Sequence, residues 1–201
     1  IPGVSSTALN VGINDDICKA IAQRAGSRFA YDTHARFLLY YGVIVHNQPP
    51  EKYFKALTNV VEASGRDRLL VSDLHEVIKQ FKAIQSAPED PFEQVISVVK
   101  AIYSKWHSEE ATNLRYDILG ARSSQGVAVI MSSMVFGNLS SNSGSGFMLS
   151  RSPMDGTKQL QVEYLSASEG EDVIVSRRTP VNAAYLKVTH TIMKHKQRCY
   201  F

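Results

Sequence analysis

Apolar residues recur at the spacing of amphipathic helices through the first 120 residues of the chain. The clearest run covers residues 28–46, where an apolar and aromatic stripe recurs at helical spacing until Pro49-Pro50 ends the pattern. The stripe consists of Phe29, Phe37, Tyr40, Tyr41 and Ile44. The same spacing predicts further helices over residues 15–25, 51–63, 72–84, 92–106 and 108–118. In the helix over 92–106 the apolar stripe consists of Phe92, Val95, Val99, Ile102 and Trp106. Such stripes are typical of helices that bury one face in a shared core.

After residue 120 the pattern changes to short apolar runs separated by glycine-rich and serine-rich turns. The apolar run 127–136 predicts a buried strand, and residues 147–151 and 160–165 predict two more, joined by a turn over 153–156. Residues 138–146 are polar apart from Leu139, which predicts a flexible hairpin tip. An amphipathic helix is expected over 185–196. The chain therefore predicts an α+β fold, with a helical subdomain over 1–120 and an antiparallel β-rich subdomain over 121–201.

Composition narrows the function classes only a little. The net charge of +3 is too small to indicate nucleic-acid binding by itself, and no apolar run approaches the roughly 20 residues that cross a bilayer. Cys18 and Cys199 stand at opposite ends of the chain, without metal or redox spacing. We therefore expect reduced thiols, an intracellular compartment and no membrane partner. Because the chain begins at Ile1, we expect a processed product, an excised fragment or part of a longer protein.

Two polar clusters are candidates for chemistry. The serine–glycine tip, with Ser145 and Gly146, offers backbone N–H groups and hydroxyls that could close over phosphate oxygens, although an ordinary hairpin loop has the same composition. The second cluster consists of carboxylates around Gly170, namely Glu163, Glu169, Glu171 and Asp172. They could form a metal cluster or a cation-binding patch, or they could act as helix caps and turn contacts. We favour caps and turn contacts for this second cluster.

Specific motifs then connect most of the chain to a known family. In the second half they are M-V-F-G-N, N-S-G-S-G-F, R-S-P, V-E-Y-L, G-E-D-V and R-T-P, in that order between residues 134 and 180. In the first half they are Pro2-Gly3, Asn14-Asp15, R-F-A-Y-D at 28–32 and D-P-F-E-Q at 90–94. Together they closely resemble the nucleotide-binding domain of pyruvate phosphate dikinase, which has an ATP-grasp-like fold. The resemblance covers nearly the whole chain.

The resemblance implies a site as well as a fold. Gly3 and the Ser145-Gly146 pair stand where the family binds the nucleotide triphosphate. The family holds its magnesium ions with the Asp and Glu of a Q-D-I-E-F motif, and here the corresponding residues after Gln197 are Arg198 and Tyr200. A guanidinium and a neutral phenol replace two carboxylates, so we expect no metal site there.

These departures favour a catalytically inactive dikinase-like domain that acts as a structural or interaction subunit of a larger intracellular assembly. One alternative is the ATP-binding part of an active dikinase, which would use ATP and Mg²⁺ to phosphorylate a histidine on a partner domain. Another is a non-catalytic nucleotide- or phosphate-binding module in which Arg198 contacts phosphate directly. We expect no cofactor in the first case. The expected partners are other subunits or domains of the same protein, and a nucleic-acid partner such as a 5′-phosphorylated RNA end lacks support beyond the mild charge.

Overall fold

The computed structural model describes residues 7–65, 69–119, 126–174 and 179–182 of the chain. The chain divides into two compact units, Ile1–Met134 and Val135–Phe201, and each is described by itself. The subdomain boundary expected between residues 120 and 121 stays a prediction, because residues 120–125 lie outside the described part. Over the described ranges, no helix combines the length and the apolar character needed to cross a membrane.

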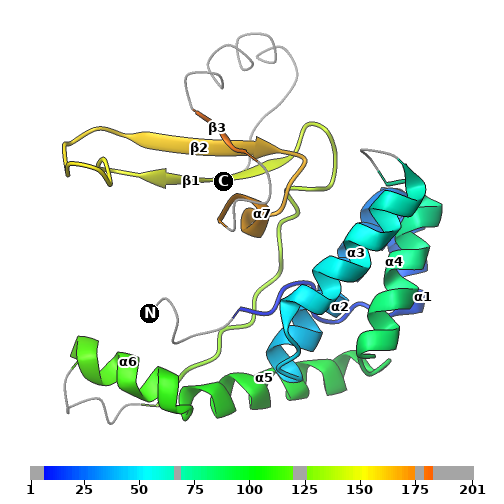
Figure 1. The fold of residues 1–201 in the computed structure, drawn as a ribbon, viewed down its shortest axis with the longest axis horizontal. Coiled ribbons are helices and arrows are strands. Elements are labelled where there is room, and N and C mark those ends of the chain that lie inside the picture. Colours follow the sequence, from blue (N-terminus) through cyan, green and yellow to red (C-terminus); the bar gives the residue numbers. More distant parts are fainter. Residues whose placement is uncertain (1–6, 66–68, 120–125, 175–178, 183–201) are drawn as a thin grey trace. The chain divides into compact units, whose positions relative to one another are not determined.

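The described part of the first unit is mainly helical (Figure 1). They are α1 (Asp15–Ala25), α2 (Ser27–Val45), α3 (Pro50–Ser64), α4 (Val71–Ile84), α5 (Pro91–Trp106) and α6 (Glu109–Leu119). α2 is central, since it packs against α1, α4 and α5, while α3 packs against α4. The helices expected from apolar spacing are confirmed, with ends shifted by no more than one residue.

The core of this unit is built on the aromatic face of α2. Phe37, Tyr40 and Tyr41 are almost fully buried, together with aliphatic residues of α4 such as Val77. The rings of Phe37 and Tyr41 lie 5.4 Å apart in a tilted arrangement. The sequence-based reading of this stripe as core is confirmed.

Local chemistry sets where the helices begin and end. Asn14 caps α1, because its side chain accepts a hydrogen bond from the N–H of Ile17 at 2.8 Å. The N-cap is therefore Asn14, and the acidic residues Asp15 and Asp16 lie in the first turn of the helix. Gly65 ends α3 in the left-handed conformation, with a φ of 60°, as expected of a glycine C-cap.

α2 and α3 approach each other closely at Gly42. A Cβ placed on Gly42 would overlap the hydroxyl of Tyr53 and lie 2.7 Å from its Cζ atom. Tyr53 is fully buried, and burial raises the pKa of its phenol. A glycine in mid-helix costs about 1 kcal/mol relative to alanine, and here its small size admits the Tyr53 ring into the core.

α5 differs from the expected pattern. The residues it buries are Gln94 and Val98, whereas Phe92, the first residue of the predicted stripe, is 78% exposed. The expectation that Phe92 packs in the core is therefore wrong. The reason is that Gln94 holds the core-facing position through hydrogen bonds to backbone, which turns Phe92 away from the core.

The second unit contains an antiparallel sheet of three strands in the order β1-β2-β3. β1 (Gly144–Leu149) pairs with β2 (Gln161–Ser166), which pairs with the short β3 (Val181–Asn182), and a short helix α7 (Gly170–Ile174) follows β2. Two of the three expected strands are thus confirmed, although β1 begins three residues earlier than expected. A helical part followed by an antiparallel sheet confirms the α+β class.

The third expected strand, 127–136, is not a strand in the structure. Its backbone makes no strand pairing with the described residues, and Ile130, Met131 and Val135 are 90%, 78% and 93% exposed. The expectation of burial is therefore wrong. An apolar run indicates that a segment can enter a sheet, but a strand forms only where a neighbour satisfies its backbone hydrogen bonds.

Candidate functional site

The serine–glycine segment forms part of a strand. Ser145 and Gly146 lie in β1, opposite Leu165 and Tyr164 of β2. The Ser145 hydroxyl donates a hydrogen bond to the carbonyl oxygen of Ser168 at 2.8 Å. Gly144 to Gly146 therefore belong to the paired strand, and the loop proper is shorter than the expected tip over 138–146.

The glycines of this hairpin stand at points of close backbone approach. A Cβ on Gly137 would overlap Ser145 Oγ and Ser168 O and lie 2.8 Å from Gly144 O. A Cβ on Gly144 would overlap the Tyr164 ring, and one on Gly146 would overlap the carbonyl oxygen of Glu163. These glycines are needed for packing inside the hairpin.

Hydrogen bonds also close the loop that precedes β1. The N–H of Asn142 donates to Ser140 Oγ at 3.2 Å, and the hydroxyls of Ser140 and Ser143 lie 3.1 Å apart. At its base, the N–H of Ala167 donates to Ser143 O at 2.7 Å and the N–H of Ser168 donates to Gly137 O at 3.0 Å. The loop is thus tied to the turn after β2.

One of the carboxylates near Gly170, that of Asp172, makes a turn contact. The N–H of Glu169 donates to Asp172 Oδ2 at 3.2 Å, which is one half of a capping box at the start of α7. Glu169 and Asp172 are nearly fully buried. This is a turn contact of the kind favoured from the sequence. Among the described side chains, no group of three or more His, Cys, Asp or Glu could hold a metal ion.

The D-P-F-E-Q motif forms a junction in the first unit. Gln94 accepts a hydrogen bond at Oε1 from the N–H of Gly12 at 2.8 Å. Its Nε2 donates to Ile13 O at 3.0 Å and to Pro88 O at 2.7 Å. Asp90 caps α5 by accepting from the N–H of Phe92 at 2.9 Å. The motif therefore ties the segment before α1 to the segment before α5.

The Asn14-Asp15 motif extends this junction. Asn14 Nδ2 donates to Glu89 O at 2.9 Å, and Lys82 Nζ lies 2.7 Å from both carboxylate oxygens of Asp15. The hydrogen bond from Lys82 is the main reason why the pKa of Asp15 is lowered, against the opposing effect of burial. His34 faces the same carboxylate, with Nδ1 3.8 Å from Asp15 Oδ1. The ion pair between Asp15 and Lys82 thus links α1 to α4, and His34 of α2 lies beside it.

Two buried groups beside this ion pair are held neutral. Burial, reinforced by the Lys82 charge and opposed by Asp15, lowers the pKa of His34 to about 4. Burial and the Asp15 charge raise the pKa of Cys18 to about 11, against the weaker effects of Lys82 and Lys19. Cys18 is a free cysteine, as expected of a reduced thiol.

Acidification is expected to destabilise the first unit through His34. Its pKa is about 4 in the folded chain and 6.5 as the reference value, so the unfolded state binds more protons between these pH values. The free energy of unfolding should have its full value above pH 6.5 and should fall by about 2 to 3 kcal/mol as the pH drops to about 4. Urea unfolding across this range measures how the free energy of unfolding depends on pH. His34→Gln should make that dependence weaker, whereas the control His107→Gln, at an exposed position, should leave it unchanged. Equal slopes in all proteins would contradict the assignment.

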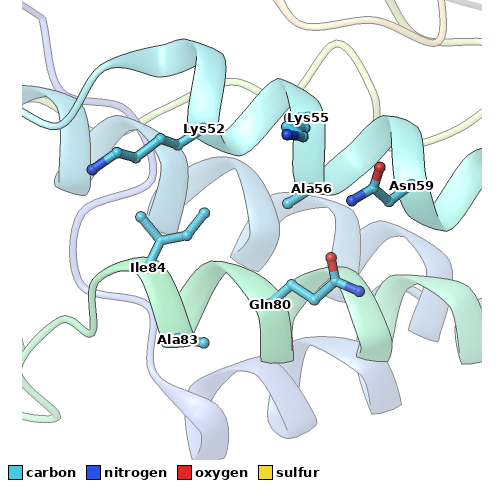
Figure 2. A pocket seen from close by; sticks show the side chains of 7 residues that line it. All are labelled: Lys52, Lys55, Ala56, Asn59, Gln80, Ala83 and Ile84. Carbon is cyan, nitrogen blue, oxygen red and sulfur yellow. The ribbon is translucent and has the colours of Figure 1, made fainter.

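An open groove of about 360 Å³ lies between α3 and α4 (Figure 2). It is lined by the side chains of Lys52, Lys55, Ala56, Asn59, Gln80, Ala83 and Ile84. Ala56, Ala83 and Ile84 give it an apolar lining, and lysine and amide side chains surround that lining. No residue singled out from the sequence takes part in it.

The structure locates only part of the predicted site. Ser145 and Gly146 lie together in β1. Gly3, Arg198 and Tyr200 lie outside the described residues, as does the helix expected over 185–196. Sequence reasoning missed the roles of Gln94 and Gly137. The only signal for either was its place within a family motif.

Comparison with known proteins confirms the resemblance drawn from the motifs: about nine tenths of the chain is similar in sequence to pyruvate, phosphate dikinases. No family model matches it. The curated relatives are pyruvate, phosphate dikinases, including the chloroplastic enzyme of Mesembryanthemum crystallinum, 35% identical over 189 residues. Dikinase 1 of Arabidopsis thaliana and dikinase 1 of Zea mays are each 35% identical, over 196 and 198 residues. These matches cover 90–93% of the chain but only 20–21% of each relative, so the chain spans about a fifth of their length.

Proposed function

We propose that this chain is a catalytically inactive dikinase-like domain that serves as a structural or interaction subunit of a larger intracellular assembly. The observation that carries the proposal is the pair Arg198 and Tyr200, which stand where the family's metal-binding carboxylates are expected. Phosphoryl transfer depends on positioning and on neutralising charge with metal ions. Magnesium binds hard oxygen ligands, so a guanidinium at its site repels it and a neutral phenol does not replace a carboxylate.

The hairpin gives independent support. If ATP were bound as in the family, Ser145 and Gly146 would be the described residues nearest its phosphates. The Ser145 hydroxyl already donates its hydrogen to Ser168 O, and Gly146 lies against the backbone of Glu163. These residues serve the hairpin itself and do not form a ready phosphate cradle. In this conformation the Ser145 hydroxyl is committed to the hairpin and does not point a donor at a triphosphate.

A second candidate is the ATP-binding part of a working dikinase. It is favoured by the 35% identity to pyruvate, phosphate dikinases over about 90% of the chain. In that case ATP and Mg²⁺ would be the cofactors, and other domains of a longer protein would be the partners. The relatives' names place them in the chloroplast, which suits an organelle for either candidate.

Calorimetric titration with ATP, with and without Mg²⁺, tests the proposal. The unchanged chain should show no magnesium-dependent ATP binding. Restoring both carboxylates with Arg198→Asp and Tyr200→Glu should raise ATP affinity in Mg²⁺ about tenfold or more. The matched control, Arg24→Asp with Tyr116→Glu, makes the same changes at exposed positions and should have no effect.

The other outcomes are equally informative. Magnesium-dependent ATP binding by the unchanged chain would refute the proposal and favour the working dikinase. Binding that needs no metal and is lost in Arg198→Asp would instead indicate a phosphate-binding module in which the guanidinium contacts the nucleotide.

A further inference from the structure

The outer face of α5 carries an exposed apolar stripe. Phe92, Ile96 and Tyr103 are 78%, 52% and 45% exposed, and Val99 lies between them, half-buried. Their spacing is four, three and four residues, so at about 100° per residue they fall within roughly 60° of arc. Gln94 and Val98 face the core on the opposite side of the helix. α5 is therefore apolar on two sides, and one of them has no partner among the described residues of the first unit.

A glutamate and a lysine flank this stripe on one side. Glu93 and Lys100 are both exposed and lie on the same side of the stripe, seven residues or about two helical turns apart. Neither side chain forms an ion pair with a described residue. In the heptad frame that puts Phe92, Ile96, Val99 and Tyr103 at a and d, Glu93 and Lys100 occupy successive e positions.

This arrangement is complementary to itself. When two copies of α5 cross in antiparallel orientation about a two-fold axis, e positions face e positions. Glu93 of each copy then meets Lys100 of the other, while the apolar stripes cover each other. If the two copies of α5 packed in parallel, neither Glu93 nor Lys100 would meet a residue of opposite charge on this side of the stripe. We propose that the Phe92–Tyr103 face of α5 is an interface at which a second copy of this chain binds in antiparallel orientation.

The size of the stripe sets the strength of the contact. Four apolar side chains on a 16-residue helix make an interface at the small end of specific protein contacts. The expected dimer is weak, with a dissociation constant on the order of tens of micromolar. Sedimentation-equilibrium measurements of the chain between about 5 and 500 µM should show a reversible monomer–dimer equilibrium. A monomer throughout this range would overturn the proposal.

Charge reversal tests the orientation. Glu93→Lys alone, or Lys100→Glu alone, places like charges opposite each other twice in the dimer and should weaken association about tenfold. An equimolar mixture of these two variants should associate as well as the unchanged chain, since each then offers the charge that the other needs. Glu62→Lys, at an exposed position of α3, is the matched control and should leave association unchanged.

Both charged positions are exposed, so circular dichroism should show unchanged helix content in every variant. Ile96→Asp should abolish association by placing a charge in the stripe. Association that is unaffected by the single charge reversals, or that fails to recover in their mixture, would overturn the antiparallel interface.

Discussion

Gln94→Leu should lower the free energy of unfolding of the first unit by about 3 to 5 kcal/mol, the largest effect expected of any single substitution described here. Gln94 is fully buried and bonds to Gly12 N, Ile13 O and Pro88 O at 2.7 to 3.0 Å. Leucine has a similar volume but leaves one buried backbone group, Ile13 O, and two partly buried ones without their partner, and each buried unsatisfied group costs about 1 to 3 kcal/mol. Urea unfolding followed by far-ultraviolet circular dichroism measures the loss.

A matched substitution separates this effect from a general intolerance of leucine. Gln80 on α4 bonds only to Glu76 near the surface, so Gln80→Leu should change stability by no more than about 0.5 kcal/mol. Gln94→Glu should be as damaging as Gln94→Leu at neutral pH, because a carboxylate cannot donate to Ile13 O or Pro88 O. Its defect should shrink at acidic pH, where protonation restores one donor. A stable Gln94→Leu protein would show that the junction contributes little.

Gly137→Ala should destabilise the hairpin of the second unit by about 2 to 4 kcal/mol. The backbone of Gly137 is not in the left-handed region, so its conformation alone would accept alanine. The added methyl would, however, overlap Ser145 Oγ and Ser168 O and lie 2.8 Å from Gly144 O. Two of these atoms belong to backbone that the sheet holds in place. Hydrogen exchange of the β1 and β2 amides should accelerate accordingly.

Two further variants identify the cause. Gly170→Ala, where a methyl would meet no described atom within 4 Å, should be neutral or stabilise the unit by up to about 1 kcal/mol. Adding Ser145→Ala to Gly137→Ala removes one overlap but leaves both carbonyl oxygens, so recovery should be partial. Full recovery would mean that the Ser145 side chain alone sets the cost.

The helical half could be predicted because its signals are local. Apolar spacing located each helix, and side chains such as Asn14 and Asp90 mark helix starts by bonding to N–H groups two or three residues away. Gln94 could not be recognised in this way. A polar residue at a helical position is read as solvent-facing unless its partners are known, and those partners lie up to 82 residues away in sequence.

In the second half of the chain, residue composition alone did not predict the structure correctly. The run 127–136 has strand composition but no strand neighbour among the described residues, and composition cannot supply one. Gly144 and Gly146 were expected in a flexible tip because glycine and serine usually indicate turns. Their actual requirement is steric: Tyr164 and Glu163 of the neighbouring strand leave no room for a Cβ. Only the paired register reveals that requirement.

The junction around Gln94 also affects what sequence similarity to the dikinases implies about function. Its motif, D-P-F-E-Q, holds two loops and a helix start together by hydrogen bonds to main-chain atoms, a task that any descendant of the same architecture must perform. Two proteins can therefore share the Asp, Pro, Glu and Gln of this motif while differing entirely in whether they turn over ATP. Sequence identity at such structural residues indicates common ancestry. Evidence that the chain catalyses the family's reaction has to come from the residues that would contact the nucleotide.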